Sequence, residues 1–238
     1  MLSEIFKLFW KTVERKDERR INSQTPPTEI EQFCDIQYID DGLWQHRLDV
    51  YSKSGKLSHR PVIIDIHGGG WMYGTKEINK NYCLVLAQND YVVVNINYRL
   101  APDFSVADQL RDCFFAFKWV STNIEKYGGD LNNVFVTGDS AGGFLAAYSA
   151  LLNSSEKLRR IFGVTESGLE FRACGLTSPV CFMNTHTFQD VYYSRVKGKE
   201  FSESTLRGFE NFDAVLNKGS MPPTFLVTSS GDAVGRLP

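Results

Sequence analysis

A serine hydroxyl lies at the centre of a short run flanked by glycines, Gly138-Asp139-Ser140-Ala141-Gly142. The pattern Gly-x-Ser-x-Gly is typical of a nucleophile elbow, a sharp turn between a strand and a helix that exposes the serine. Glycines two positions before and two after the serine allow the strand and the helix to approach closely. The apolar run 133–137 precedes the motif and the small, apolar run 141–152 follows it. The pattern therefore predicts that Ser140 is the nucleophile of an acyl-transfer reaction.

A second motif, His67-Gly68-Gly69-Gly70-Trp71, directly follows the apolar run 61–66. A triple glycine can turn its backbone N–H groups toward one point, as an oxyanion hole requires. A phosphate-binding loop would need a lysine followed by serine or threonine, and this run has neither. A flexible surface loop is the remaining alternative. The order of the two motifs, glycine loop first and elbow second, favours the oxyanion hole.

With Tyr98-Arg99-Leu100-Ala101-Pro102-Asp103, these motifs resemble the hormone-sensitive-lipase-like branch of the α/β-hydrolase esterases over about residues 62–232. The resemblance implies a carboxylesterase or lipase-like serine hydrolase that cleaves esters of small or medium acyl chain through an acyl-enzyme. It implies no metal and no organic cofactor. It also implies that the N–H groups of Gly69, Gly70 and Ala141 form the oxyanion hole. Supporting roles in the loop and the elbow then fall to His67, Gly68, Gly138, Asp139 and Gly142.

The triad acid is expected after the serine, at the end of a later strand. The run 224–230 has the composition of such a strand, and Gly231-Asp232-Ala233 follows it. We therefore expect Asp232 to be the acid, and an ordinary turn aspartate is the alternative. Asp139 occupies the variable position of the elbow, where we expect a local hydrogen-bonding role.

The triad base should be a histidine after the acid in chain order. The chain has four histidines, His46, His59, His67 and His186, and none of them follows Asp232. This pattern predicts a C-terminally incomplete chain that lacks the last strand and helices of the family fold. His186 is the alternative base. Because a serine without a base is a poor nucleophile, we expect the chain as written to be nearly inactive.

Two other functions remain open besides ester hydrolysis. Amide hydrolysis, including arylformamidase-like chemistry, uses a similar glycine loop and elbow. A non-catalytic role in binding a small ligand is also possible, because plant gibberellin receptors resemble these esterases but lack the triad histidine.

The strands and helices that must position these residues alternate along the chain. Runs typical of strands are 33–39, 45–51, 61–66, 91–96, 133–137, 171–177 and 224–228, and helical runs are 78–87, 106–127 and 141–152. The first two strands alternate polar and apolar residues and are expected to be half-exposed and antiparallel, with Asp40-Asp41-Gly42 as their turn. The later strands are apolar on both faces, as in a parallel sheet. The sequence therefore predicts an α/β-hydrolase fold, with a mostly parallel central sheet and helices on both faces.

We expect one domain over residues 1–238. Residues 1–25 predict an amphipathic helix that packs on the domain or over its pocket. The segment 179–223 mixes aromatic and polar residues and predicts either a small cap or a long crossover.

The overall composition excludes several classes of partner. A formal net charge of −2 gives no basic field for nucleic acid and no polybasic membrane patch. No apolar run is long enough to cross a bilayer. The five cysteines are scattered and form no CxxC pair, which is typical of reduced thiols in a cytoplasmic protein. The predicted partner is therefore a small-molecule ester.

Overall fold

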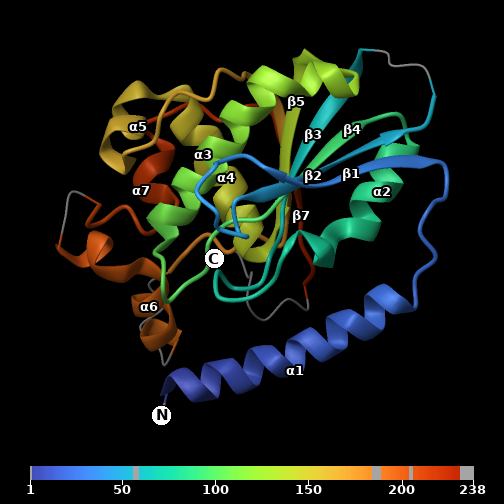
Figure 1. Cartoon of the computed structure of the whole chain (residues 1–238). Helices are drawn as coiled ribbons and strands as arrows, with labels where there is room; N and C mark the ends of the chain where they lie inside the picture. Colours follow the sequence, from blue (N-terminus) through green and yellow to red (C-terminus); the bar gives the residue numbers. More distant parts are fainter. Residues whose placement is uncertain (1, 56–58, 184–188, 204–205, 231–238) are drawn as a thin grey trace.

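A mostly parallel sheet forms the centre of the computed structural model, which describes residues 2–55, 59–183, 189–203 and 206–230 (Figure 1). Within these residues the sheet has seven strands in the order β1-β2-β4-β3-β5-β6-β7. They are β1 (Ile30–Gln37), β2 (Arg47–Lys53), β3 (Arg60–Ile66), β4 (Val92–Ile96), β5 (Gly129–Asp139), β6 (Phe171–Thr177) and β7 (Thr224–Val227). β2 pairs antiparallel with both β1 and β4, and all other neighbours are parallel. The expected α/β-hydrolase fold is confirmed.

Helices cover both faces of this sheet. The helices of the described residues are α1 (Leu2–Asn22), α2 (Lys80–Gln88), α3 (Val106–Asn123), α4 (Ser140–Ser154), α5 (Glu156–Phe162), α6 (Gln189–Glu203) and α7 (Asp213–Leu216), with 3-10 turns η1 (Lys76–Asn79) and η2 (Ile124–Tyr127). α3 and α4 lie on one face and α2 lies on the other (Figure 1). α6 and α7 belong to the segment that connects the parallel strands β6 and β7.

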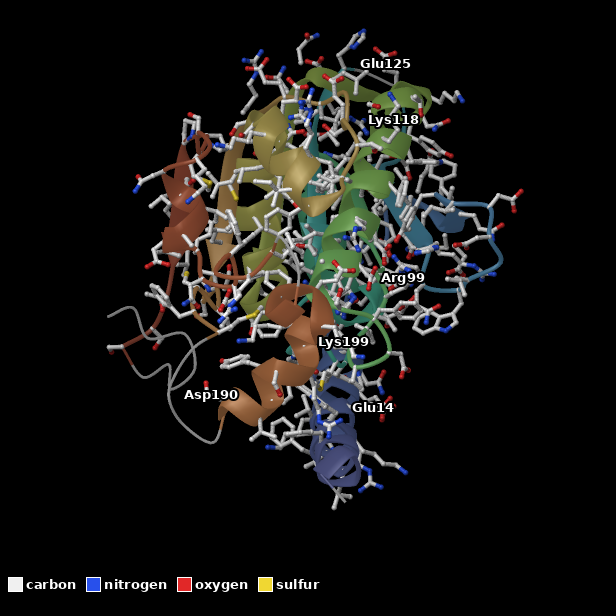
Figure 2. All side chains as sticks on the ribbon, turned by 90° about the vertical axis from the view of Figure 1, so that its left-hand side faces the viewer. Glu14, Arg99, Lys118, Glu125, Asp190 and Lys199 are labelled. Carbon is white, nitrogen blue, oxygen red and sulfur yellow. The ribbon has the colours of Figure 1, made fainter. Side chains whose placement is uncertain are left out.

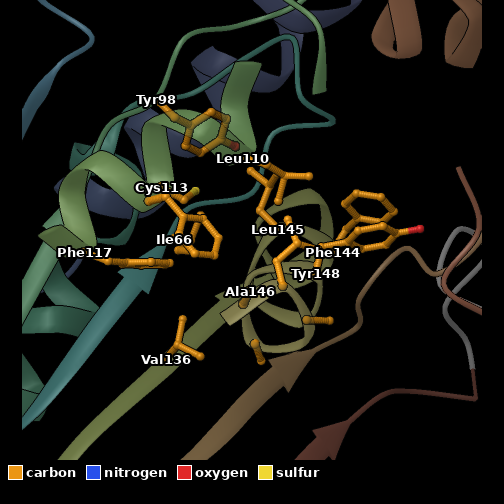
Figure 3. Packing of buried hydrophobic residues seen from close by; sticks show 14 of the residues in the cluster. Ile66, Tyr98, Leu110, Cys113, Phe117, Val136, Phe144, Leu145, Ala146 and Tyr148 are labelled. Carbon is orange, nitrogen blue, oxygen red and sulfur yellow. The ribbon is translucent and has the colours of Figure 1, made fainter. Parts of the chain in front are cut away.

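The core lies between the sheet and the pair α3 and α4 (Figure 3). Leu110 and Phe117, which recur at helical spacing on α3, are fully buried. On α4, Ala146 and its small neighbours let the helix lie close to the sheet, while Phe144 and Tyr148 stack at 4.1 Å between ring centroids. The burial of this apolar surface, at about 25 cal/mol per Å², is the main favourable term that holds α3 and α4 in place.

The first two strands differ from the expectation. β2 begins at Arg47 and its residues 48–52 are buried, because it lies between β1 and β4 instead of at an edge. The polar residue Asp49 is buried there because it is satisfied: it accepts hydrogen bonds from the Asp35 N–H at 2.8 Å and the Tyr51 hydroxyl at 2.6 Å. Lys76 lies 3.0 Å from the same carboxylate. The predicted three-residue turn is also wrong, since the strands are joined by the longer loop 38–46.

α1 docks on the rest of the chain through one face. Trp10 stacks on Tyr73 with ring centroids 5.3 Å apart, and Phe6 lies edge-on to Tyr192 of α6 at 5.1 Å. Leu8 and Phe9 on the other face are exposed. Figure 2 shows α6, which carries Asp190 and Lys199, directly beside α1, which carries Glu14. No helix among the described residues has both the length and the apolar character needed to cross a membrane.

A buried ionic cluster ties the loop before β2 to α3. The Nδ1 atom of His46 lies 2.7 Å from the Asp41 carboxylate, and its Nε2 lies 3.2 Å from that of Asp112. Asp112 also accepts hydrogen bonds from Arg99, at 2.7–3.1 Å from the Nη2 and Nε atoms of its guanidinium and at 2.9 Å from its backbone N–H. Burial lowers the pKa of His46, but the hydrogen bonds and charges of Asp112 and Asp41 outweigh it, so the pKa is raised above 6.5.

Replacing the imidazole by an uncharged amide tests this cluster. We expect His46→Gln to be less stable than the parent chain by about 1–3 kcal/mol at pH 6, because the buried Asp112 and the exposed Asp41 lose their shared cationic partner. The folded pKa lies above the unfolded value, so the ion pairs stabilise fully below pH 6.5 and are lost as pH rises through the folded pKa. The difference in free energy of unfolding between His46→Gln and the parent chain should therefore shrink toward pH 9. Urea unfolding of both chains from pH 6 to 9 measures it, and a deficit independent of pH would contradict the assignment.

Candidate active site

Ser140 lies at the turn between β5 and α4, where the strand ends at Asp139 and the helix begins. Its φ is 50°, in the left-handed region that a non-glycine residue adopts only under constraint. The flanking glycines have no room for a side chain. A Cβ at Gly138 would lie 2.4 Å from the Gly142 carbonyl oxygen, and a Cβ at Gly142 would lie 2.0 Å from that of Ile66. The turn has the strand-to-helix geometry that a nucleophile elbow requires.

The glycine loop leaves the end of β3 in an equally constrained conformation. Gly69 and Gly70 have φ values of 113° and 58°. A Cβ at Gly69 would lie 2.0 Å from the backbone oxygen of Tyr73, so the loop can close only with glycine there. A cavity of about 190 Å³ is lined by Gly69, Gly70 and Ser140 together. Ala141 is buried in the first turn of α4, where backbone N–H groups have no partner within the helix. The fold thus brings the predicted loop and the predicted elbow to one cavity.

Asp139 connects the elbow to the glycine loop. Its Oδ1 atom accepts a hydrogen bond from the Gly68 N–H at 3.0 Å and another from the Asn79 side chain at 2.8 Å. The same amide nitrogen of Asn79 donates to the Asp65 carboxylate at 2.9 Å. The Gly68 N–H is therefore occupied, while Gly69 and Gly70 face the cavity. Sequence reasoning missed Asn79 and Asp65, since no motif marks an asparagine sixty residues before the elbow or an aspartate inside an apolar strand.

His67 is fully buried within the loop. Its Nδ1 lies 2.7 Å from the Gly68 carbonyl oxygen, to which a neutral ring donates. Burial lowers the pKa of His67 to about 4, so the ring is neutral at pH 7. Tyr98 stacks on the imidazole at 4.4 Å and its hydroxyl donates to the His67 carbonyl oxygen at 2.8 Å. These contacts fix the start of the glycine loop.

Two of the expected triad residues, Asp232 and His186, lie outside the described residues. His46 faces Asp41 and Asp112 in the ionic cluster described above. Within the described ranges, no group of three or more metal-binding side chains is placed to hold an ion.

The first helix forms one wall of the cavity. Trp10, Val13, Asp17 and Arg20 of α1 line it opposite the glycine loop. Arg20 holds the helix in register by donating to the backbone oxygen of Ile78 at 3.1 Å. An amphipathic helix over the pocket was one of the two expectations for residues 1–25, and the sequence alone did not indicate which of its residues would reach the site.

Comparison with known proteins identifies the family. The BD-FAE family model matches residues 48–189. The chain belongs to this family. Its members are α/β-hydrolases, and the resemblance to hormone-sensitive-lipase-like carboxylesterases is confirmed.

Similar solved structures and curated relatives support the assignment of the chain to this family. The structure of Esterase B from Lactobacillus rhamnosis, inhibited by a tributyrin phosphonate, is 30% identical, with a TM-score of 0.91 over 98% of this chain and 75% of that one. Isoprenylcysteine alpha-carbonyl methylesterase ICME of Arabidopsis thaliana is 28% identical over 79% of this chain and 46% of its own length. Carboxylesterase NlhH of Mycobacterium tuberculosis is 34% identical over 47% of this chain and 35% of its own. The chain thus spans less than half of these two curated relatives.

The buried carboxyl beneath the elbow gives a prediction with a definite sign. Burial, and secondarily the charge of Asp139, raise the pKa of Asp65 to about 7 from 3.8, so its ionisation opposes folding as pH rises. Asp65→Asn keeps an oxygen for Asn79 and removes the ionisation. We expect the variant to match the parent chain near pH 4 and to be more stable at pH 8, by up to about 4 kcal/mol. Urea unfolding across this range measures the gain, and Asp130→Asn, at a half-exposed carboxylate whose pKa is lowered by a backbone hydrogen bond from Asn132, serves as a control that should lack it.

The contact between α4 and β3 gives a second prediction. Gly142→Ala places a methyl group against the Ile66 carbonyl, and we expect a loss of about 3 kcal/mol or more, or failure to fold. Gly175→Ala is a milder comparison, because its methyl group would meet the Thr137 side chain at 3.0 Å instead of a backbone atom. Near-ultraviolet circular dichroism and urea midpoints report both. A Gly142→Ala chain as stable as the parent would show that the helix is free to shift.

Proposed function

We propose that this chain carries the acylation site of a carboxylesterase, with Ser140 as nucleophile and the N–H groups of Gly69, Gly70 and Ala141 as the oxyanion hole. One observation carries the proposal: a strained serine at the start of a helix shares a 190 Å³ cavity with two glycines held in the left-handed region. Asp139 supports the same geometry by binding the Gly68 N–H.

The proposed reaction is acyl transfer in two steps. The Ser140 oxygen attacks the ester carbonyl carbon, its proton passes to a base, and the developing oxyanion meets the loop and helix N–H groups. The positive end of the α4 dipole favours this negative charge. The carbonyl re-forms as the alcohol leaves with a proton, and water then hydrolyses the acyl-serine to a carboxylic acid. This sequence needs no cofactor.

The names of similar proteins favour an ester as the substrate. Esterase B, NlhH and ICME are named as esterases, and Esterase B was captured with a tributyrin phosphonate. Tributyrin is an ester of a short acyl chain, which agrees with the small cavity of this chain. We therefore propose small or medium esters as substrates, and a cytoplasmic location because the five cysteines are free thiols.

We propose Asp232, which lies outside the described residues, as the acid, and no histidine follows it within the 238 residues. Neither the His46 ring, held by two carboxylates, nor the His67 ring, held by Gly68, has a hydrogen bond to Ser140. The 238 printed residues are accordingly expected to turn over esters slowly, because loss of the triad histidine costs about 10⁶-fold in a well-studied serine protease.

A phosphonate probe tests the nucleophile without requiring turnover. We expect an activated butyl p-nitrophenyl phosphonate to modify Ser140 slowly and selectively, since the oxyanion site is present, and mass spectrometry to locate the adduct there. Ser140→Ala should lose the adduct, and Ser121→Ala, at a half-exposed serine of α3, should keep it. Labelling at another serine, or none, would refute the assignment.

Hydrolysis of p-nitrophenyl acetate tests the base. We expect a residual acceleration of about 10³–10⁴ over water that changes little in Ser140→Ala. Rapid turnover by the 238-residue chain that Ser140→Ala abolishes would show that one of its own residues acts as the base.

A further inference from the structure

Two cavities share one aromatic pair, Trp10 of α1 and Tyr73 after the glycine loop. The first is the cavity of about 190 Å³ that contains Ser140. The second, of about 500 Å³, is lined mainly by apolar groups that include Phe6, Leu100 and Phe104. Trp10 and Tyr73 line both cavities. Because the two residues line both spaces and their rings are stacked, the pair marks the boundary, here called the partition, between the space around Ser140 and the larger space.

The partition is held in place from three directions. The rings of Trp10 and Tyr73 are stacked, with an angle of 13° between their planes. The Tyr73 hydroxyl lies 3.3 Å from the Asp17 carboxylate and donates to it, which ties the glycine loop to α1. A Cβ at Gly70 would lie 2.5 Å from both the Trp10 ring and the Tyr192 hydroxyl, so the indole fits tightly between the glycine loop and α6. Tyr192 itself donates a hydrogen bond to the Gly70 carbonyl oxygen.

We propose that Trp10 determines the size of the group that binds beside Ser140, and that the 500 Å³ cavity is an apolar subsite for longer alkyl chains which Trp10 closes off. The inference rests on the proposed function, because it concerns the substrate of that same site. A cavity of about 150 Å³ holds one benzene molecule. The 190 Å³ around Ser140 accordingly suits a group of about four to six carbons. A longer chain has to enter the second cavity, and the indole lies in its path.

The charged side chains around the larger cavity suit an uncharged alkyl chain whose outer end faces solvent. The charged residues that line it with the apolar groups are Lys11 and Glu14 of α1, Arg195 of α6, and Asp103 of the loop before α3. They are two of each sign, so they provide a polar mouth and no net attraction for an ionic ligand. The chemistry that recognises the subsite is therefore the burial of methylene groups, which is worth about fourfold in affinity for each one buried.

Binding of neutral carbonyl compounds tests the partition independently of catalysis. The probes are 2-butanone, 2-hexanone, 2-octanone and 2-decanone, with dissociation constants from calorimetry. For the parent chain we expect affinity to rise to 2-hexanone and then to level off. For Trp10→Ala we expect it to rise through 2-decanone, which should bind at least tenfold tighter than to the parent chain. Leu8→Ala, on the exposed face of the same helix at 69% exposure, should behave as the parent does.

Each other outcome decides the question. An unchanged chain-length profile in a folded Trp10→Ala chain, or no binding of any ketone by either chain, overturns the inference. If Trp10→Ala does not fold, Trp10→Phe is tested in its place, because it keeps a ring in the stack. We expect Trp10→Phe to bind 2-decanone about threefold more tightly than the parent chain does. Unchanged binding of 2-decanone would again overturn the inference. The phosphonate adduct on Ser140 judges the proposed function separately, since ketone binding needs no nucleophile.

Discussion

The close approach of the first turn of α4 to the end of β3 is the constraint on which the site depends. Gly142 lies so near the Ile66 carbonyl that a single methyl group would sit 2.0 Å from it. Ile66 is also the last residue of β3, and the glycine loop begins at the next position. One backbone contact therefore fixes both the direction of the Ser140 turn and the place where the loop N–H groups start. Neither half could move without the other, which is how preorganised donors are kept at a reacting atom.

A partly buried polar layer under this contact stabilises the geometry at a cost in folding free energy. Asn79 uses its side-chain amide to join Asp65 and Asp139, and Asp139 in turn holds Gly68. Burial is the main cause of the raised pKa of Asp65, and the charge of the nearby Asp139 adds to it. His67 stays neutral for the same reason of burial. Such local losses of folding free energy are common at active sites, because the packed core around a site can hold strained groups in place.

The sequence predicted those parts of the fold that local pattern decides. The glycine spacing around Ser140 indicated a strand-to-helix turn, and the strand expected at 171–177 has the bounds of β6, because both follow from short-range sterics and burial. The burial of β2 was not predictable by alternation, since Asp49 is compensated by Lys76, which is distant in sequence. Trp10 and Asn79 escaped prediction for the same reason: their roles arise from contacts with the glycine loop and the elbow that no local motif records.

The position of α1 links substrate size to the stability of its docking. The helix is held by the aromatic contacts of Phe6 and Trp10 and by the bond from Arg20 to Ile78, while its outer face remains exposed. A helix attached through one face undocks at a lower free energy than the core unfolds. Because Trp10 belongs both to the docking face and to the partition, any change that weakens docking also removes the wall beside Ser140. The size limit of the site is thus a property of this tertiary contact, and the elbow and glycine loop alone would leave it open.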